Sequence, residues 1–127
     1  MSKTFNIELW EKLKTDFLDS NVFFGQAPED TPAPYCVIYV LSANEDNNSK
    51  TLCQVDREVD LQFNVYGFND MQIDELLDEL VTTLKSYKLL TSYRIKMGIE
   101  SSTKCASSFS SEIGMGLTRF NFYFEKL

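Results

Sequence analysis

The chain has no histidine and only three cysteines, three prolines and five glycines. Without histidine it lacks the commonest general base near neutral pH and the commonest zinc ligand. The spacing of Cys36, Cys53 and Cys105 matches no zinc or redox motif, so we interpret all three as reduced structural thiols of a cytoplasmic setting. Cys36 lies in an apolar run and is expected to be buried. These absences predict no catalytic residue, no cofactor and no metal ligand, and thus a protein that is not an enzyme.

Long apolar runs are also missing. No segment reaches the ~18 apolar residues of a membrane span, and charges interrupt the N-terminal sequence where a secretory signal would need an apolar stretch. We therefore expect no membrane partner. The 127 residues predict a single domain covering the whole chain, 1–127.

Positive charge is scarce relative to negative charge. Twelve Lys and Arg residues face nineteen Asp and Glu residues, and the net charge is −7. Because a field of that sign repels phosphate backbones, we expect no sequence-specific nucleic-acid binding. The same charge favours docking onto a basic patch of another protein.

Two segments carry the apolar stripe of an amphipathic helix. The first is predicted over residues 4–19, with Thr4 as its cap. Its stripe consists of Phe5, Leu9, Leu13 and Phe17, and its charged residues, Glu8 among them, are assigned to the other faces. The second is predicted over residues 70–86, capped by Asn69 or Asp70, acidic in its first half and basic at its end, as the helix dipole favours.

The remaining apolar segments have strand character. Strands are predicted at 22–24, 35–43, 51–66, 93–99 and 117–127, with 35–43 and 51–66 forming an antiparallel hairpin. In "DREVDLQFNVYG" one face carries Val59, Leu61, Phe63 and Val65, and the other carries Asp56, Glu58 and Asp60. Tyr93, Ile95, Met97 and Ile99 alternate in the same way, and "GMG" at 114–116 is interpreted as a turn. The predicted fold class is α+β, an antiparallel or mixed β-sheet with two amphipathic helices packed on one face.

The carboxylates Asp56, Glu58 and Asp60 have two interpretations. A catalytic acid–base pair needs two contrasting environments, and three similar carboxylates on one strand offer none. They form either a solvated face or an electronegative surface that lines a channel or meets a basic neighbour. The loop "NEDNNSK" lacks the ligand pattern and the glycine of a calcium loop, so no metal is predicted there.

Three stretches in fixed order resemble a known family. They are "VFFGQAPEDTPAPYCVIYVLS" after the first helix, the alternating strand "REVDLQFNVYG", and the helix "MQIDELLDELVTTL". This order, with "P-Y-x-V-I-Y", then "Q-F-x-V-Y", then an Asp- and Leu-rich helix, resembles the tail completion or tail terminator proteins of long-tailed bacteriophages. The resemblance covers nearly the whole chain and rests on order and pattern; the serine-rich stretch before the last strand departs from it.

The resemblance implies a structural virion protein assembled in the host cytoplasm. Such proteins form a homo-oligomeric, hexameric ring at the head-proximal end of the tail tube. The ring ends tube polymerisation and presents a surface for the head–tail connector or stopper protein. Its implied partners are itself, the tail tube protein and that connector, and DNA passes through its lumen. The alternatives are another neck component, such as a head–tail stopper, and a non-viral protein-interaction module; an enzyme using carboxylates alone ranks last.

Two loops are the predicted contact segments, because binding residues concentrate on loops. The candidate subunit, tail or neck contacts are Glu29 and Asp30 in the arm 26–34, and Glu45, Asp46, Asn47, Asn48 and Lys50 in the tip 44–50. The carboxylates Asp56, Glu58 and Asp60 are the candidate lumen or interface residues. Alternatively, both loops only connect the strands and contact no partner.

Overall fold

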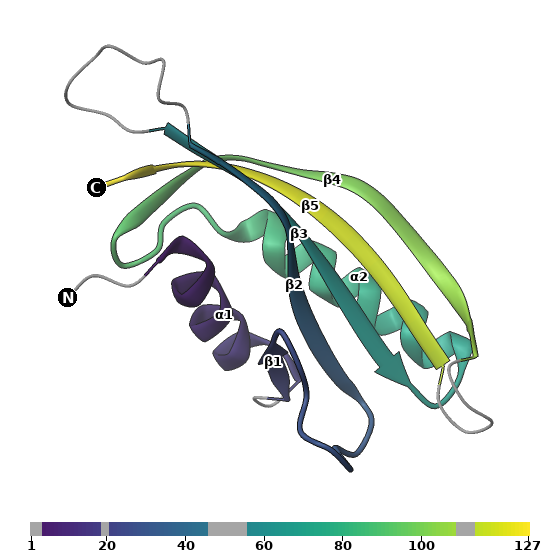
Figure 1. The fold of residues 1–127 in the computed structure, drawn as a ribbon. Helices are drawn as coiled ribbons and strands as arrows, with labels where there is room; N and C mark the ends of the chain where they lie inside the picture. Colours follow the sequence, from purple (N-terminus) through teal and green to yellow (C-terminus); the bar gives the residue numbers. More distant parts are fainter. Residues whose placement is uncertain (1–3, 19–20, 46–55, 109–113) are drawn as a thin grey trace.

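Five strands form one mixed sheet in the order β1-β2-β3-β5-β4. A computed structural model describes residues 4–18, 21–45, 56–108 and 114–127. Along the chain the elements are α1 (Phe5–Asp16), β1 (Val22–Phe24), β2 (Tyr35–Glu45), β3 (Asp56–Gly67), α2 (Asp70–Ser86), β4 (Tyr93–Ser108) and β5 (Gly114–Lys126). β1 runs parallel to β2, and the other neighbours are antiparallel. Both helices lie on the same side of the curved sheet (Figure 1), which confirms the α+β prediction.

Both helices begin at the predicted caps. Thr4 Oγ1 accepts a hydrogen bond from the Ile7 amide at 3.3 Å, and Asn69 Oδ1 accepts one from the Gln72 amide at 2.8 Å. These bonds satisfy backbone donors that the first helical turn leaves free. α2 matches its predicted bounds, whereas α1 ends at Asp16, before the predicted 19, because the backbone turns extended at Phe17.

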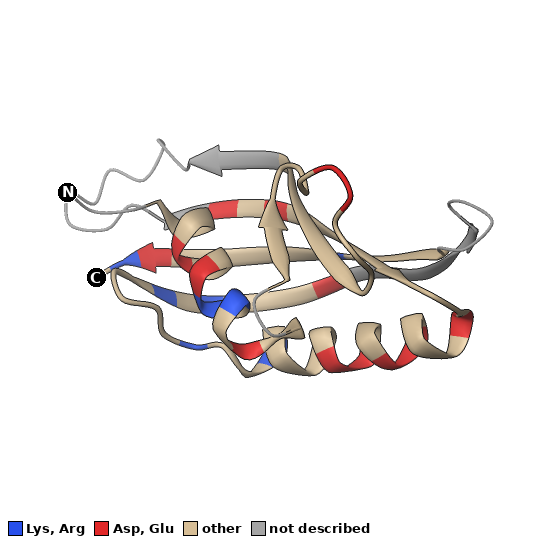
Figure 2. Cartoon of the chain, turned by 90° about the horizontal axis from the view of Figure 1, so that it is seen from below, with Lys and Arg blue, Asp and Glu red and all other residues tan. Residues whose placement is uncertain are grey.

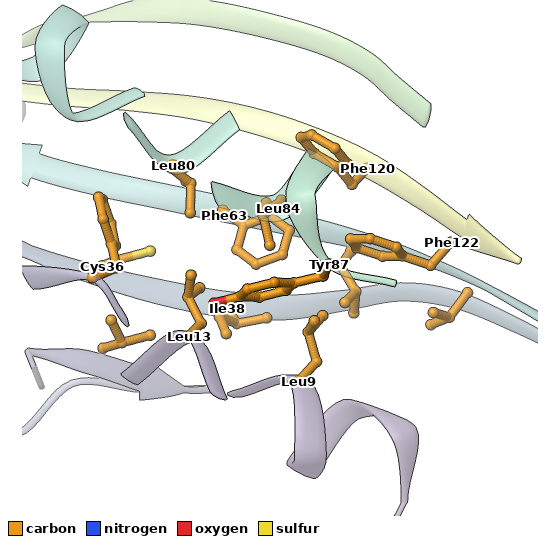
Figure 3. Close-up of a cluster of buried hydrophobic side chains, with 14 of the residues drawn as sticks. Leu9, Leu13, Cys36, Ile38, Phe63, Leu80, Leu84, Tyr87, Phe120 and Phe122 are labelled. Carbon is orange, nitrogen blue, oxygen red and sulfur yellow. The ribbon is translucent and has the colours of Figure 1, made fainter. Parts of the chain in front are cut away.

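The apolar stripes of the helices meet the apolar face of the sheet. Val59, Leu61, Phe63 and Val65 are at most 2% exposed, as their alternation predicts. Figure 3 shows the layer they share with both helices and β5, including Leu9, Leu13, Leu80, Leu84, Phe120 and Phe122. Cys36 lies in this layer as a buried free thiol, which confirms its interpretation. The other two cysteines lie outside the described side chains.

The glycines of "GMG" lie inside β5, so the prediction of a turn at 114–116 is wrong. Close packing of α2 against this strand explains why glycines stand there. A Cβ on Gly116 would lie 2.5 Å from Ile73 Cγ2 and 2.8 Å from Leu77 Cδ1. Only a residue without a side chain lets α2 come this near the strand. β5 therefore starts at Gly114, three residues before the predicted strand.

A bulge in β4 changes the face of its second half. Ile95 pairs with Phe124, but Met97 pairs with Tyr123, so Lys96 is the extra residue. Met97 and Ile99 are consequently 55% and 48% exposed, and the prediction that they share a face with Tyr93 and Ile95 is wrong. β4 also continues to Ser108, through part of the serine-rich stretch.

Candidate functional site

The candidate site is the face of the sheet opposite the helices, which we call the open face. β3 and β5 contribute its centre, because the side chains between their core residues point away from α1 and α2. Its polar members on these strands are Glu58, Asp60, Gln62, Asn64, Arg119 and Asn121. The predicted separation of apolar and carboxylate faces on β3 is thus observed for Val59 to Val65 on one side and for Glu58 and Asp60 on the other.

One amide holds two of the predicted carboxylates together. Asn121 Nδ2 donates to Glu58 Oε1 at 2.8 Å and to Asp60 Oδ1 at 2.7 Å, and all three side chains are half-buried. A shared donor offsets part of the repulsion between like charges two residues apart on one face. Asp56 continues the strand, opposite Glu125 in the register, and its side chain is outside the described part.

A second polar group interrupts the negative charge. Arg119 Nε donates to Gln62 Oε1 at 3.1 Å, and Gln62 Nε2 donates to Asn64 Oδ1 at 2.8 Å. Asn64 is only 8% exposed, and this hydrogen bond gives its buried Oδ1 a donor. The open face therefore has an acidic end at Glu58 and Asp60 and an amide- and arginine-bearing middle.

Tyrosines occupy the other end of the open face, which sequence reasoning treated only as part of a buried strand. Tyr35 and Tyr66 stack with ring centroids 4.6 Å apart, and Phe23 contacts Tyr35 edge-on at 6.4 Å. Burial, and next the neighbouring Tyr66, raises the pKa of both Tyr35 and Tyr39. Burial thus favours the neutral form of both hydroxyls, and the Tyr39 side chain is hydrogen-bonded to Tyr66. The signal for this cluster was the β2–β3 register, which places Tyr35 opposite Tyr66.

The two predicted contact segments adjoin β2 along the chain. The arm containing exposed Glu29 and Asp30 leads into Tyr35, whereas the first two residues of the predicted tip 44–50 belong to the strand itself, because Asn44 pairs with Glu58 and Glu45 pairs with Arg57. At ~3.3 Å per residue, eleven strand residues place Tyr35 and Glu45 roughly 35 Å apart. Glu45 is described only in its backbone, and Asp46, Asn47, Asn48 and Lys50 lie outside the described residues. Among the described contact candidates, Glu29 and Asp30 therefore precede the start of β2, and Glu45 ends it.

A separate cleft lies on the helix side, between α1 and the connection from α2 to β4. It measures about 530 Å³ and is lined by Glu8, Glu11, Lys12, Leu89, Leu90 and Thr91. Glu8 is only 7% exposed, and its Oε1 accepts a hydrogen bond from the Ser92 amide at 2.8 Å. Its assignment to a solvent face is therefore wrong. Its place beside Leu9, at the border of the apolar stripe, was the available signal.

No group of three or more Asp, Glu or Cys residues in the described part could hold a metal ion. Burial raises the pKa of the Cys36 thiol, which favours its unreactive neutral form. Neither described helix has the length and apolar character that a bilayer crossing requires. A scan against protein-family models and a search of curated proteins find no match for the chain.

Proposed function

We propose that this chain forms a ring at the head-proximal end of a phage tail tube, where it ends tube polymerisation and joins tail to head. The observation that carries the proposal is the difference between the two faces of the sheet. One face is fully used by α1 and α2, and the other remains open with ordered polar and aromatic side chains. The order of helix, short strand, hairpin, helix and final strands agrees with the resemblance of the sequence to tail terminators.

Ring closure by copies of one chain requires two different surfaces on each subunit. The described residues offer separated surfaces: the arm with exposed Glu29 and Asp30 precedes the start of β2, and the strand ends at Glu45. The two ends of α2 differ as well, since its first turn carries Asp70 and its last turn carries Lys85. A single self-complementary patch would instead favour a closed dimer.

The open face is proposed to line the lumen. Glu58 and Asp60 would place carboxylates beside the path of the DNA, and like charge would limit adhesion of the phosphate backbone because phosphate contacts dominate nucleic-acid affinity. Arg119 is tied to Gln62 at the middle of the same face. A lumen of this kind permits DNA passage without sequence recognition.

The test combines mass with a tube assay. Native mass spectrometry of the full chain is expected to show one closed multiple of the 14.6 kDa subunit, six by the resemblance. Added to polymerising tail tube protein encoded near this chain, the ring should shorten the tubes and lie at one end in electron micrographs. Tubes of unchanged length without terminal density, next to a well-formed ring, would exclude termination. Binding to the portal side alone would favour the head–tail stopper.

A further inference from the structure

Exposed apolar side chains lie at both ends of α2, two at its start and one beyond its end. At its start, Phe68 is 58% exposed and Met71 is 73% exposed. Beyond its end, Leu89 is 56% exposed. Large apolar side chains that remain in water together often mark a contact with another protein. At 1.5 Å per residue, the 17 residues of α2 separate these sites by about 25 Å, so they are two surfaces and not one.

The two sites differ in shape. Phe68 and Met71 protrude from the tight connection between β3 and α2, which is fixed by a 2.8 Å hydrogen bond from the Phe68 amide to Gln72 Oε1. Leu89 instead borders the cleft of about 530 Å³ against α1. A protruding turn and a cleft are the two halves of a heterologous contact.

Charge also distinguishes the two sites. The first turns of α2 expose Asp70, Asp74 and Glu75, whereas Lys85 and Lys88 are exposed at and just after its last turn. Figure 2 shows acidic positions along one half of α2, and both basic and acidic positions toward the end of the molecule that carries the C-terminus. The cleft lining holds Glu8 and Glu11 beside Lys12, and Lys85 Nζ lies 3.7 Å from Glu100 Oε1. Two acidic turns would repel each other, so pairing of a turn with the charge-mixed cleft is less repulsive than pairing of two turns.

We propose that the turn 68–71 of one copy docks in the α1 cleft of a second copy. Phe68 would bury its ring against the exposed Leu89, and Asp70 would lie near Lys12 and Lys88. Leu90 is only 6% exposed and packs in the core beneath the lining. Glu8 is already engaged by the Ser92 amide and holds the cleft wall in place. The inference rests on the proposed ring and names the contact that builds it, one turn and one cleft per subunit.

Two single variants test this contact in the full chain. Phe68→Asp removes the apolar side chain of the turn, and Leu89→Asp removes the apolar side chain that borders the cleft. Both positions are exposed, so the monomer should remain folded. Circular dichroism and the urea midpoint would verify this. By native mass spectrometry each variant should lose the ring signal at least tenfold in favour of monomer. Mixed together, the two variants should form a heterodimer and nothing larger, because each contributes one intact half of the contact.

Thr82→Asp is the matched control, since Thr82 is exposed on α2 between the two sites and belongs to neither of them nor to the open face. It should keep the ring. Rings from Phe68→Asp, equal loss in Thr82→Asp, or a mixture that stays monomeric would overturn the contact while leaving the ring itself standing. A wild-type chain that is monomeric at every concentration would instead remove the ring and the contact together. If another protein occupied the cleft, Leu89→Asp alone would lose its binding and the wild-type ring would not depend on Phe68.

Discussion

The two faces of the sheet are built by different rules. On the covered face, Phe63 and Phe120 are fully buried and contact each other edge-on, so burial alone places them. On the open face, Asn121 is placed by two hydrogen bonds to carboxylates of the neighbouring strand. Strand alternation thus separates the side chains that form the core from polar side chains that hydrogen bonds hold in place outside it.

The largest expected effect falls on the covered face. Phe63→Ala should lower the free energy of unfolding by about 3–5 kcal/mol, since it removes a fully buried ring and leaves a cavity beneath α2. Arg119→Ala on the open face should cost less than about 1 kcal/mol, because its bond to Gln62 is exposed. Urea unfolding of both variants measures the contrast. Equal losses in the free energy of unfolding would show that the covered face does not contribute more to stability than the open face.

Overpacking the covered face should have the next largest effect. Gly116→Ala places a methyl group 2.5 Å from Ile73 Cγ2, so α2 must shift, at a cost of about 1–3 kcal/mol. Gly98→Ala is the control on the neighbouring strand β4, where the nearest atom belongs to Phe122 of β5 and not to α2, with Cε1 at 3.1 Å. Thermal unfolding should show the greater loss for Gly116→Ala. A neutral result there would mean that α2 does not lie against β5 as described.

Alkaline pH should weaken the fold through the buried thiol. Burial raises the pKa of Cys36 above its ordinary value of 9.0, so the unfolded chain releases this proton first. The stabilisation is therefore fully present below pH 9 and is lost as the pH rises above it, by at most ~1.4 kcal/mol per pH unit. Cys36→Ala should be less stable at pH 7.5 but decline less steeply between pH 9 and 10.5. Parallel declines in urea titrations would contradict the assignment.

The smallest effect belongs to the open face. Asn121→Ala removes the amide shared by Glu58 and Asp60 and should cost about 1 kcal/mol. Without the amide, Glu58 and Asp60 repel each other. The loss should therefore be greater at low ionic strength, where less salt screens this repulsion. Asn121→Asp adds a third carboxylate and should be worse. Unfolding free energies measured in low and high salt compare the three proteins.

Periodicity was sufficient to predict most of the fold. The stripe of α2, the alternation of β3 and both helix caps depend on residues close in sequence, and the structure confirms them. The β4 bulge and the site of Gly116 depend on neighbours brought together by the sheet, so the local pattern could not contain them.

The candidate surfaces were less predictable for the same reason. Glu58 and Asp60 were placed on the correct face, but the amide that joins them comes from Asn121, sixty residues away or more. Glu8 is engaged by an amide 84 residues later in the chain. Such contacts follow from the topology, which only the folded chain supplies.

The most direct measurement of the central claim is a cryo-electron microscopy map of the full chain assembled on a tail tube. The account predicts a closed ring at the tube end, with Glu58 and Asp60 turned toward the channel and α1 and α2 on the outside. A map with the helices lining the channel, or with these carboxylates on the outer surface, would contradict it.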